Sequence, residues 1–406
     1  MTKANSSAIH RPADRLSGIA LSEIVQISER ARQMRAEGRD VIALSTGEPD
    51  FPTPPEVIEA AHQAALAGQT RYTPTAGTPE LRAEVARQAG AEPANVIIST
   101  GAKQVLANAM LATLNPGDEV IMPAPFWTSY ADMVRMAGGT PVVLPCPLSQ
   151  SFKLTPEQLS DAITPQTRWL MLNSPSNPSG AIYTAGEYTQ LAETLAAHPQ
   201  VWVVADEIYE HLSYTPFTSF AEAAPHLRNR TLIVNGVSKA WSMTGWRIGW
   251  GIGPAELIRD MISVQGQTTS GAPSVSQAAA LAALQSDRQL LKDRRTTFLA
   301  RRDATIDGLN AIPGLTCPAP DGAFYAFPDC SALIEGRFEN DAALCQWLLE
   351  ETGVALVPGR AFGMPGHVRL SFAYAESQIR EALSRMKTAI DRLTSAPSTA
   401  FAGHTG

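Results

Sequence analysis

The chain has 406 residues, of which 44% are hydrophobic and 17% are charged. This length and composition are typical of a globular protein with two or more domains and large apolar cores. The formal net charge is −7 and no basic face stands out, so nucleic acid and anionic membrane surfaces are not expected as partners.

No pattern in the sequence predicts a metal site, a disulfide framework or a membrane segment. The four cysteines are widely separated and include no Cys-x-x-Cys pair (Cys146, Cys317, Cys330 and Cys345). No apolar run reaches 18 residues, and the polar first 13 residues lack the apolar core of a signal peptide. We therefore expect a metal-free protein of the reducing cytoplasm.

Helical and strand patterns alternate along the chain. In order, they predict a helix at 24–37 that stops at Gly38, a strand at 41–44, helices at 55–66 and 79–88, a strand at 96–99, a turn at 100–103 with a helix to about 114, a strand at 118–122, a helix at 127–136, and strands at 140–144, 169–172, 201–205 and 231–235. Helical segments separate most of the later strands, which predicts an α/β fold with a largely parallel, doubly wound sheet. A charged helix at about 286–309 should lead into a second, α+β domain. Residues 1–14 and 395–406 are expected to be a flexible arm and tail.

Lys239 indicates the chemistry most directly. It follows Ser238 in a stretch of small residues, and Arg247 stands eight positions later. A lysine amine can form a Schiff base with an aldehyde cofactor, and the serine and arginine can hold that cofactor's phosphate, which points to pyridoxal phosphate. An isolated Ser-Lys pair is more often a surface turn. Two tryptophans and an arginine in the same dozen residues favour the cofactor site.

Two further segments bring suitable groups to strand ends. Gly101 and Ala102 lie where a strand turns into a helix, and free N–H groups at a helix N-terminus bind phosphate. Asp206 ends an apolar strand, where its carboxylate can pair with a protonated pyridine nitrogen, and Tyr209 can contact the phenolic oxygen. Taken alone, the Gly101 segment is better explained by an ordinary strand–helix turn, and Asp206 is explained at least as well by a helix cap.

The remaining candidates are an amide, an aromatic ring and a cation. Asn177 follows another strand in a proline-rich loop and can donate to the same phenolic oxygen, although such loops are often plain turns. Trp127 can stack on a flat heterocycle or pack in the core. Arg369 lies in an apolar strand, where a cation is costly unless it is paired. Either a substrate carboxylate or an internal salt bridge would account for it.

Together these segments resemble the fold-type I pyridoxal-phosphate aminotransferases of class I/II, the aspartate aminotransferase-like enzymes, from about residue 22 to 393. The resemblance implies a large domain at 51–294 with a mostly parallel central sheet flanked by helices, and a smaller α+β domain built from 15–50 and 295–394. It also implies the following roles: Lys239 as Schiff-base lysine and proton shuttle, Asp206 at the pyridine nitrogen, Asn177 and Tyr209 at the phenolic oxygen, Trp127 on the ring, Gly101, Ala102, Ser238 and Arg247 at the phosphate, and Arg369 at the substrate α-carboxylate.

On the substrate side, the segment around Gly47 resembles the loop of the family that closes over the substrate carboxylate. Tyr72 resembles a tyrosine that reaches the phosphate of the neighbouring subunit, which implies a homodimer with shared active sites. Within the family the chain is most similar to the bacterial aspartate/prephenate aminotransferases, and Lys103 and Ser22 match the residues with which that subgroup recognises the distal carboxylate.

Three positions depart from that subgroup. Ala20 stands where a lysine is common, Ile24 where a threonine is common, and Arg360 where a serine is usual. These changes make prephenate a less favoured substrate, whereas Lys103 keeps aspartate and glutamate plausible. Arg360 either adds a cation for an acidic side chain or lies at the surface near the entrance.

The predicted activity is reversible, ping-pong transfer of an amino group between an L-amino acid, above all aspartate or glutamate, and 2-oxoglutarate or oxaloacetate. An aminotransferase for aromatic or aliphatic amino acids is an alternative, and so is a lyase or decarboxylase on the same fold. A DNA-binding regulator would need a further N-terminal domain, and a nicotinamide enzyme would need a GxGxxG turn after a strand; the sequence has neither.

Overall fold

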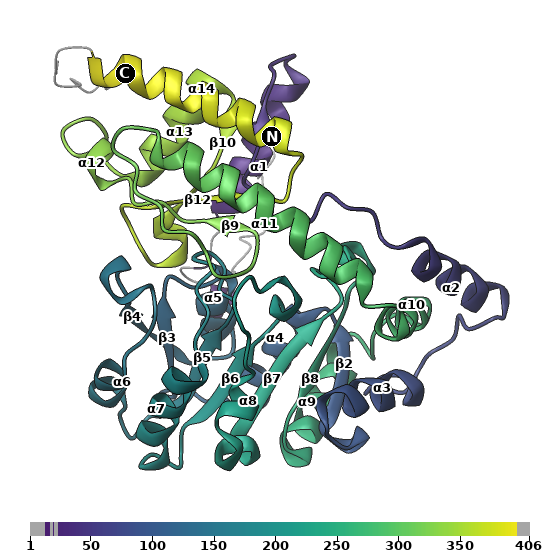
Figure 1. The fold of residues 1–406 in the computed structure, drawn as a ribbon. Helices are drawn as coiled ribbons and strands as arrows, with labels where there is room; N and C mark the ends of the chain where they lie inside the picture. Colours follow the sequence, from purple (N-terminus) through teal and green to yellow (C-terminus); the bar gives the residue numbers. More distant parts are fainter. Residues whose placement is uncertain (1–12, 17–18, 20–22, 396–406) are drawn as a thin grey trace, which may run out of the picture.

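The computed structural model describes residues 13–16, 19 and 23–395. Its main layer is a seven-stranded sheet in the order β2-β8-β7-β6-β5-β3-β4 (Figure 1). The strands are β2 (Val96–Thr100), β3 (Glu119–Ala124), β4 (Thr140–Pro145), β5 (Thr167–Asn173), β6 (Trp202–Asp206), β7 (Thr231–Gly236) and β8 (Ile248–Ile252). Only the two pairings made by β8 are antiparallel, so the predicted largely parallel sheet is confirmed.

Helices cover both faces of this sheet because successive residues of its buried strands point to opposite sides. In β6, Val204 packs toward one layer of helices, whereas Val203 and Ala205 pack toward the other. The first layer is α4 (Ala102–Thr113), α5 (Ser129–Met136) and α9 (Ala255–Thr268), and the second is α6 (Pro156–Ala162), α7 (Ala185–Ala196) and α8 (Phe220–Ala223). At the β2–β8 end pack α2 (Pro55–Leu66), α3 (Pro79–Ala89) and α10 (Ser274–Gln285).

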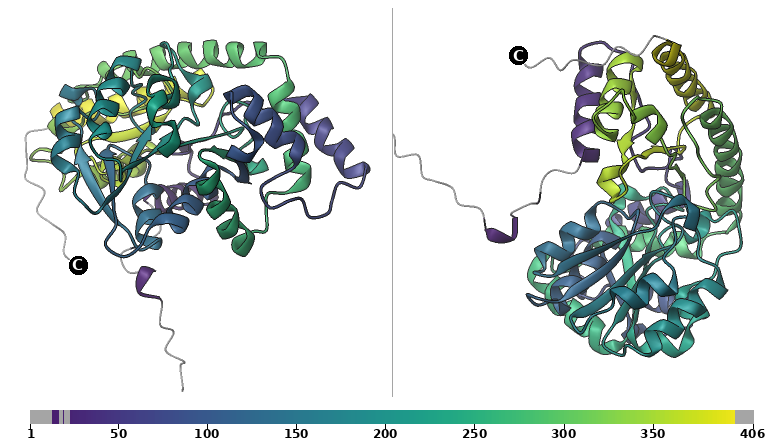
Figure 2. Two further views of the ribbon diagram at one scale, coloured as in Figure 1. Left: turned by 90° about the horizontal axis from the view of Figure 1, so that it is seen from below. Right: turned by 90° about the vertical axis from the view of Figure 1, so that its left-hand side faces the viewer.

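A second body lies against the large sheet and contains the N-terminal segment and the C-terminal part of the chain (Figures 1 and 2). Its strands are β1 (Ile42–Ala43), β9 (Tyr325–Ala326), β10 (Val354–Ala355), β11 (Val357–Pro358) and β12 (Val368–Ser371). β1 pairs in parallel with β10, and β11, β12 and β9 form an antiparallel sheet. Its helices are α1 (Glu23–Ala36), α11 (Gln289–Asn310), α12 (Ser331–Ile334), α13 (Asp341–Thr352) and α14 (Glu376–Ser395). Long α11 runs from α10 up to α14, as Figure 1 shows.

The structure differs from the sequence prediction in two informative places. β8 was not predicted, because its sequence Ile-Gly-Trp-Gly-Ile contains two glycines, which are depleted in strands. α4 packs directly on these glycines, since a Cβ built at Gly251 would lie 2.7 Å from Val105 Cγ1. The helix predicted at 127–136 begins only at Ser129, although its N-cap residue Thr128 already has helical φ and ψ angles of −48° and −31°. Just before it, the N–H of Phe126 bonds to the carbonyl of Phe362 and so connects this segment to the second body.

Candidate active site

Most of the predicted site residues gather at one edge of the large sheet. The parallel strands all end there, and antiparallel β8 begins there: Thr100 pairs with Ile248, and Gly236 pairs with Gly249. Such an edge is where ligands of open α/β sheets bind. It carries Gly101, Ala102, Trp127, Asn177, Asp206, Tyr209, Ser238, Lys239 and Arg247. Gly47 and Arg369 reach it from the second body, as the contacts below show.

The amine of Lys239 lies in the middle of this group. Its Nζ donates to the carbonyl of Gly47 over 2.7 Å and lies 5.9 Å from the ring centroid of Tyr209. Burial lowers the pKa of Lys239 to about 8, although the carboxylate of Glu48 opposes the shift. A larger fraction of the amine is therefore neutral and nucleophilic near neutral pH than for an exposed lysine.

Asp206 is a buried carboxylate at the end of β6, only 3% exposed. Its Oδ2 accepts a hydrogen bond from Tyr130 Oη over 2.6 Å, and its Oδ1 accepts one from the N–H of Ile208 over 3.2 Å. Burial raises the pKa of Asp206 to about 6, against the effect of these bonds. One oxygen is therefore bound by the backbone that follows the strand and the other by Tyr130, and the N-cap of the next helix is Tyr209, not Asp206.

Tyr130 was not predicted as a site residue. It lies in α5, it is fully buried, and its ring meets the ring of Trp127 edge-on at 5.5 Å. The sequence signal was its position three residues after Trp127, a spacing that would place both side chains on one face of the helix predicted at 127–136. In an apolar segment that spacing is equally typical of core packing.

A glycine cradle holds Arg247 beside the N-terminus of α4. Gly101 caps that helix with φ +82° and offers no side-chain hydrogen bond. A Cβ built at Gly101 would lie 2.5 Å from Arg247 Nη2, and one at Gly249 would overlap the backbone nitrogen of Ala102. The guanidinium donates to the carbonyl of Thr244 over 2.7 Å and to that of Thr100 over 3.5 Å, and the side chain is exposed. The structure thus brings the helix N-terminus and the Arg247 guanidinium together, an arrangement that suits an anion.

Arg369 is a buried cation, 2% exposed, with a spare donor. Its Nη1 donates to Asn177 Oδ1 over 3.0 Å and its Nη2 to the carbonyl of Ser45 over 2.6 Å, while its Nε has no hydrogen-bond partner. The rings of Tyr325 and Phe362 lie 4.6 and 5.0 Å from the guanidinium. Among the described residues no acidic side chain pairs with Arg369, so the internal salt bridge considered above is absent from this part of the chain.

The predicted residues for the substrate side chain are only partly described. Lys103 Nζ lies 4.8 Å from the ring centroid of Trp127, and burial and the charge of Arg247 lower the pKa of Lys103. Tyr72 is 97% exposed in the single chain. Ala20, Ser22 and the side chain of Ile24 lie outside the described residues, as do nearly all of the predicted arm and tail.

Arg360 lies in the 3-10 helix η7 (Gly359–Phe362), and its charge is already balanced. Its Nε donates to Asp341 Oδ1 over 2.6 Å, and its backbone N–H donates to Asp341 Oδ2 over 2.7 Å. Asp341 is buried at the start of α13. Arg360 is therefore the partner of a buried carboxylate, a role that neither sequence alternative included.

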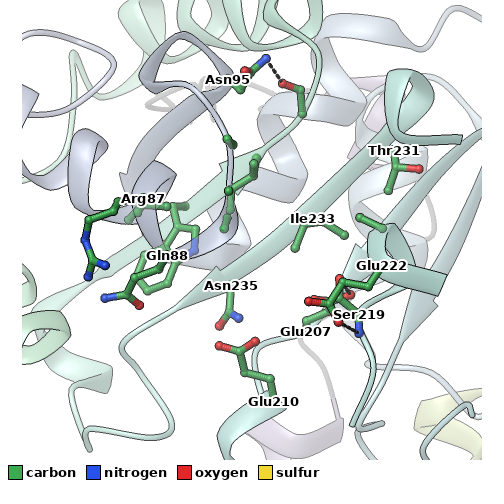
Figure 3. A pocket seen from close by; sticks show the side chains of 18 of the residues that line it. Arg87, Gln88, Asn95, Glu207, Glu210, Ser219, Glu222, Thr231, Ile233 and Asn235 are labelled. Atoms are coloured by element: carbon green, nitrogen blue, oxygen red, sulfur yellow. Dashed lines mark hydrogen bonds between the residues drawn. The ribbon is translucent and has the colours of Figure 1, made fainter. Parts of the chain in front are cut away.

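A separate cavity of about 1330 Å³ opens on the other face of the sheet (Figure 3). Asn235 of β7 lines it together with Glu207 and Glu210, whereas Val234 and Asp206 belong to the opposite face. Burial raises the pKa of Glu207 to about 8 and that of Glu210 to about 7, so both carboxyl groups hold protons more tightly than exposed glutamates. None of the predicted site residues lines this cavity.

Within residues 13–16, 19 and 23–395, no helix is long and apolar enough to cross a bilayer. In the same part of the chain, no group of three or more His, Cys, Asp or Glu side chains could hold a metal ion.

A mostly parallel sheet with an amine, a buried carboxylate and an arginine beside a helix N-terminus at its carboxyl edge is typical of the fold-type I class of pyridoxal-phosphate enzymes. Comparison with known proteins gives the same class: the model of the family "aminotransferase class I and II" matches residues 39–386. The chain belongs to the class I and II aminotransferases, and it is a pyridoxal-phosphate-dependent transaminase that acts on amino acids and 2-oxo acids.

Several relatives match almost end to end. An aspartate aminotransferase of Rhizobium meliloti is 50% identical over 95% of this chain and 97% of its own length. An aspartate/prephenate aminotransferase of Cereibacter sphaeroides is 48% identical over 92% and 97%. Among solved structures, an aspartate aminotransferase from Rhizobium meliloti superposes with a TM-score of 0.91 at 49% identity over 94% of this chain and 99% of its own. An aspartate aminotransferase of Thermus thermophilus, solved with maleate, gives 0.88 at 40% identity over 94% and 100%. The predicted family, fold class, cofactor and reaction type are confirmed.

Proposed function

We propose that this transaminase uses L-aspartate or L-glutamate as amino donor and 2-oxoglutarate or oxaloacetate as acceptor, with ping-pong kinetics. The observation that carries the choice of a dicarboxylate is the cation Lys103, whose Nζ lies 4.8 Å from the ring centroid of Trp127. The buried Arg369, with its unpartnered Nε, suits the α-carboxylate that every amino acid has. The names of the relatives support the choice of aspartate, and maleate in the Thermus structure is itself a dicarboxylate.

Pyridoxal phosphate, when bound, supplies an aldehyde that captures the amino acid and a ring that accepts electrons from its Cα. The residues fit this group, because an amine of lowered pKa, a buried carboxylate and a cationic glycine cradle lie at one sheet edge. Lys239 would attach it and move the proton at the substrate Cα, and Asp206 would hold the proton of the pyridine nitrogen. The other proposed contacts are Asn177 and Tyr209 at the phenolic oxygen, Trp127 over the ring, and Gly101, Ala102, Ser238 and Arg247 at the phosphate.

The distal carboxylate of the substrate would be bound by Lys103 together with Ser22, while the loop at Gly47 closes over the α-carboxylate. The position of Lys103 over the ring of Trp127 supports this assignment, since the proposed cofactor ring lies against the same tryptophan. Arg360 is not proposed as a substrate cation, because Asp341 already neutralises it. Lys103 is then the cation that selects an acidic side chain.

We further propose a homodimer in which Tyr72 reaches the partner's phosphate site. Tyr72 is 97% exposed, and two apolar side chains of the neighbouring α2, Leu66 and Ile58, are 69% and 49% exposed, which is typical of a surface that a second chain covers. We also propose a division into 51–294 and a smaller domain of 15–50 with 295–394, and a cytoplasmic location. The four unpaired cysteines are consistent with a reducing compartment.

The test is a set of single half-reactions in which purified holoenzyme is mixed with one L-amino acid at a time. Transfer of the amino group should replace the cofactor absorbance at about 360–430 nm by absorbance at about 330 nm. Fast conversion with aspartate and glutamate is expected. Conversion with aromatic or aliphatic amino acids alone would contradict the dicarboxylate proposal, and turnover without any 2-oxo acid would favour a lyase or decarboxylase.

A further inference from the structure

We infer that Tyr325 is a positioning residue that links the substrate-carboxylate arginine to the tyrosine at the cofactor's phenolic oxygen. The inference rests on the roles proposed above for Arg369 and Tyr209. Tyr325 was not singled out in the sequence, and in β9 it lies in an apolar run that is typical of core.

Three contacts place Tyr325 between the two halves of the site. Its Oη lies 2.9 Å from Tyr209 Oη. Its ring lies 4.6 Å from the guanidinium of Arg369, and Arg369 belongs to β12, the strand that pairs with β9. Its hydroxyl also lies against Gly47, where a built Cβ would be 2.5 Å from Oη. The carbonyl of Gly47 in turn accepts the hydrogen bond from Lys239. The buried side chain of Tyr325 therefore contacts Arg369, Gly47 and Tyr209.

The number of protons on each hydroxyl decides which of the two tyrosines donates to the other once the cofactor is bound. A tyrosine hydroxyl has one proton to donate. If Tyr209 donates it to the phenolic oxygen, Tyr325 must be the donor to Tyr209. Burial raises the pKa of both hydroxyls, so both stay protonated at working pH. A hydroxyl that accepts a hydrogen bond is a stronger donor in turn, so Tyr325 strengthens the bond from Tyr209 to the cofactor.

The consequence is a pH effect on the bound cofactor. A stronger hydrogen bond to the phenolic oxygen stabilises the negative charge of that oxygen. It thereby lowers the proton affinity of the neighbouring nitrogen through which Lys239 would hold the cofactor. Removal of the Tyr325 hydroxyl should therefore raise the pH midpoint of the cofactor's visible absorbance change. From the net strength of one hydrogen bond, the expected rise is about 0.4–1 pH unit.

The ring of Tyr325 has a separable effect on the carboxylate site. Tyr325→Phe keeps the ring beside Arg369, and binding of maleate to the holoenzyme should stay within about twofold of wild type. Tyr325→Leu removes the ring, and maleate should bind about 3- to 30-fold more weakly, as expected for a buried cation–π contact. A generally disturbed site would not separate the two readouts in this way.

Tyr214→Phe is the matched control. Tyr214 Oη donates to the carbonyl of Ala323, in the same segment as Tyr325, over 2.5 Å, but it does not contact Tyr209. The experiment titrates the absorbance of each holoenzyme with pH, measures its maleate affinity, and checks its fold by circular dichroism and thermal melting. The inference expects a raised midpoint in both Tyr325 variants, which lack the hydroxyl, and an unchanged midpoint in Tyr214→Phe.

An unshifted midpoint in Tyr325→Phe, or an equal shift in Tyr214→Phe, would overturn the inference while leaving the proposed function intact. A wild-type protein with no cofactor absorbance to titrate would instead overturn the proposed site, and the inference with it.

Discussion

The guanidinium of Arg369 is a buried charge that no carboxylate among the described residues neutralises. Neutral acceptors, Asn177 Oδ1 and the carbonyl of Ser45, hold two of its nitrogens, and two aromatic rings enclose it. A cation in such a setting is stabilised when an anion arrives, so the substrate α-carboxylate would complete an arrangement that the protein leaves incomplete.

Replacing Arg369 by lysine should expose this role. Lysine keeps the charge but loses the planar fork, and loss of a charged hydrogen bond should lower kcat/KM for aspartate roughly 10- to 100-fold, mainly through KM. Arg360→Lys is the control, because a lysine there can still pair with Asp341, and steady-state kinetics should stay near wild type. Equal losses in both variants would argue that the arginines act through folding rather than through substrate.

Among single residues, the sequence predicts the site residues whose chemistry is unusual for their position. Lys239 among small residues and Asp206 at a strand end are such cases. Tyr130 and Tyr325 are not, because a tyrosine in an apolar segment fits a core equally well. The contact of Asn177 with Arg369 joins residues 192 positions apart, and periodicity does not report which loops meet. Only the family resemblance pointed to their convergence.

Among the elements, β8 is the one on which the proposed phosphate site depends most. β8 is antiparallel to its neighbours, so its first residue lies at the edge of the sheet where the parallel strands end. This places Arg247, which directly precedes β8, beside Gly101. The sequence could not reveal this strand because its glycines, which let α4 approach, also remove the strand signal. The buried strands β3, β5, β6 and β7 were predictable from their continuous apolar runs.

Gly249→Ala should therefore damage both stability and the cofactor site. The added Cβ overlaps the backbone of Ala102, and overpacking of this kind costs about 1–3 kcal/mol. Urea unfolding should show that loss, and absorbance titration should show weaker binding of pyridoxal phosphate. Gly245→Ala, four residues away with open space around its Cβ position, should change neither quantity. A Gly249→Ala protein with wild-type stability would contradict the close approach of α4 and β8.

For the whole molecule, the proposed sharing of sites between subunits can be tested with hybrid dimers. One chain carries Lys239→Ala and the other Tyr72→Ala, with different affinity tags. If Tyr72 serves the partner's site, one site of the hybrid has both lesions and the other has none, so about half of the wild-type activity should return at limiting cofactor. If Tyr72 serves its own chain, both sites are damaged and the hybrid should be no better than its parents.

The pairing of β1 with β10 means that one part of the fold can form only late in synthesis of the chain. Ile42 pairs with Val354, so β1 leaves the ribosome about 300 residues before its partner does. At about 5–20 residues per second, that strand waits roughly 15–60 s with its backbone groups unpaired, while the strands of the large sheet can already associate. The proposed substrate loop at Gly47, which follows β1 directly, can therefore be held by the β1–β10 pairing only after all seven strands of the large sheet have been synthesised.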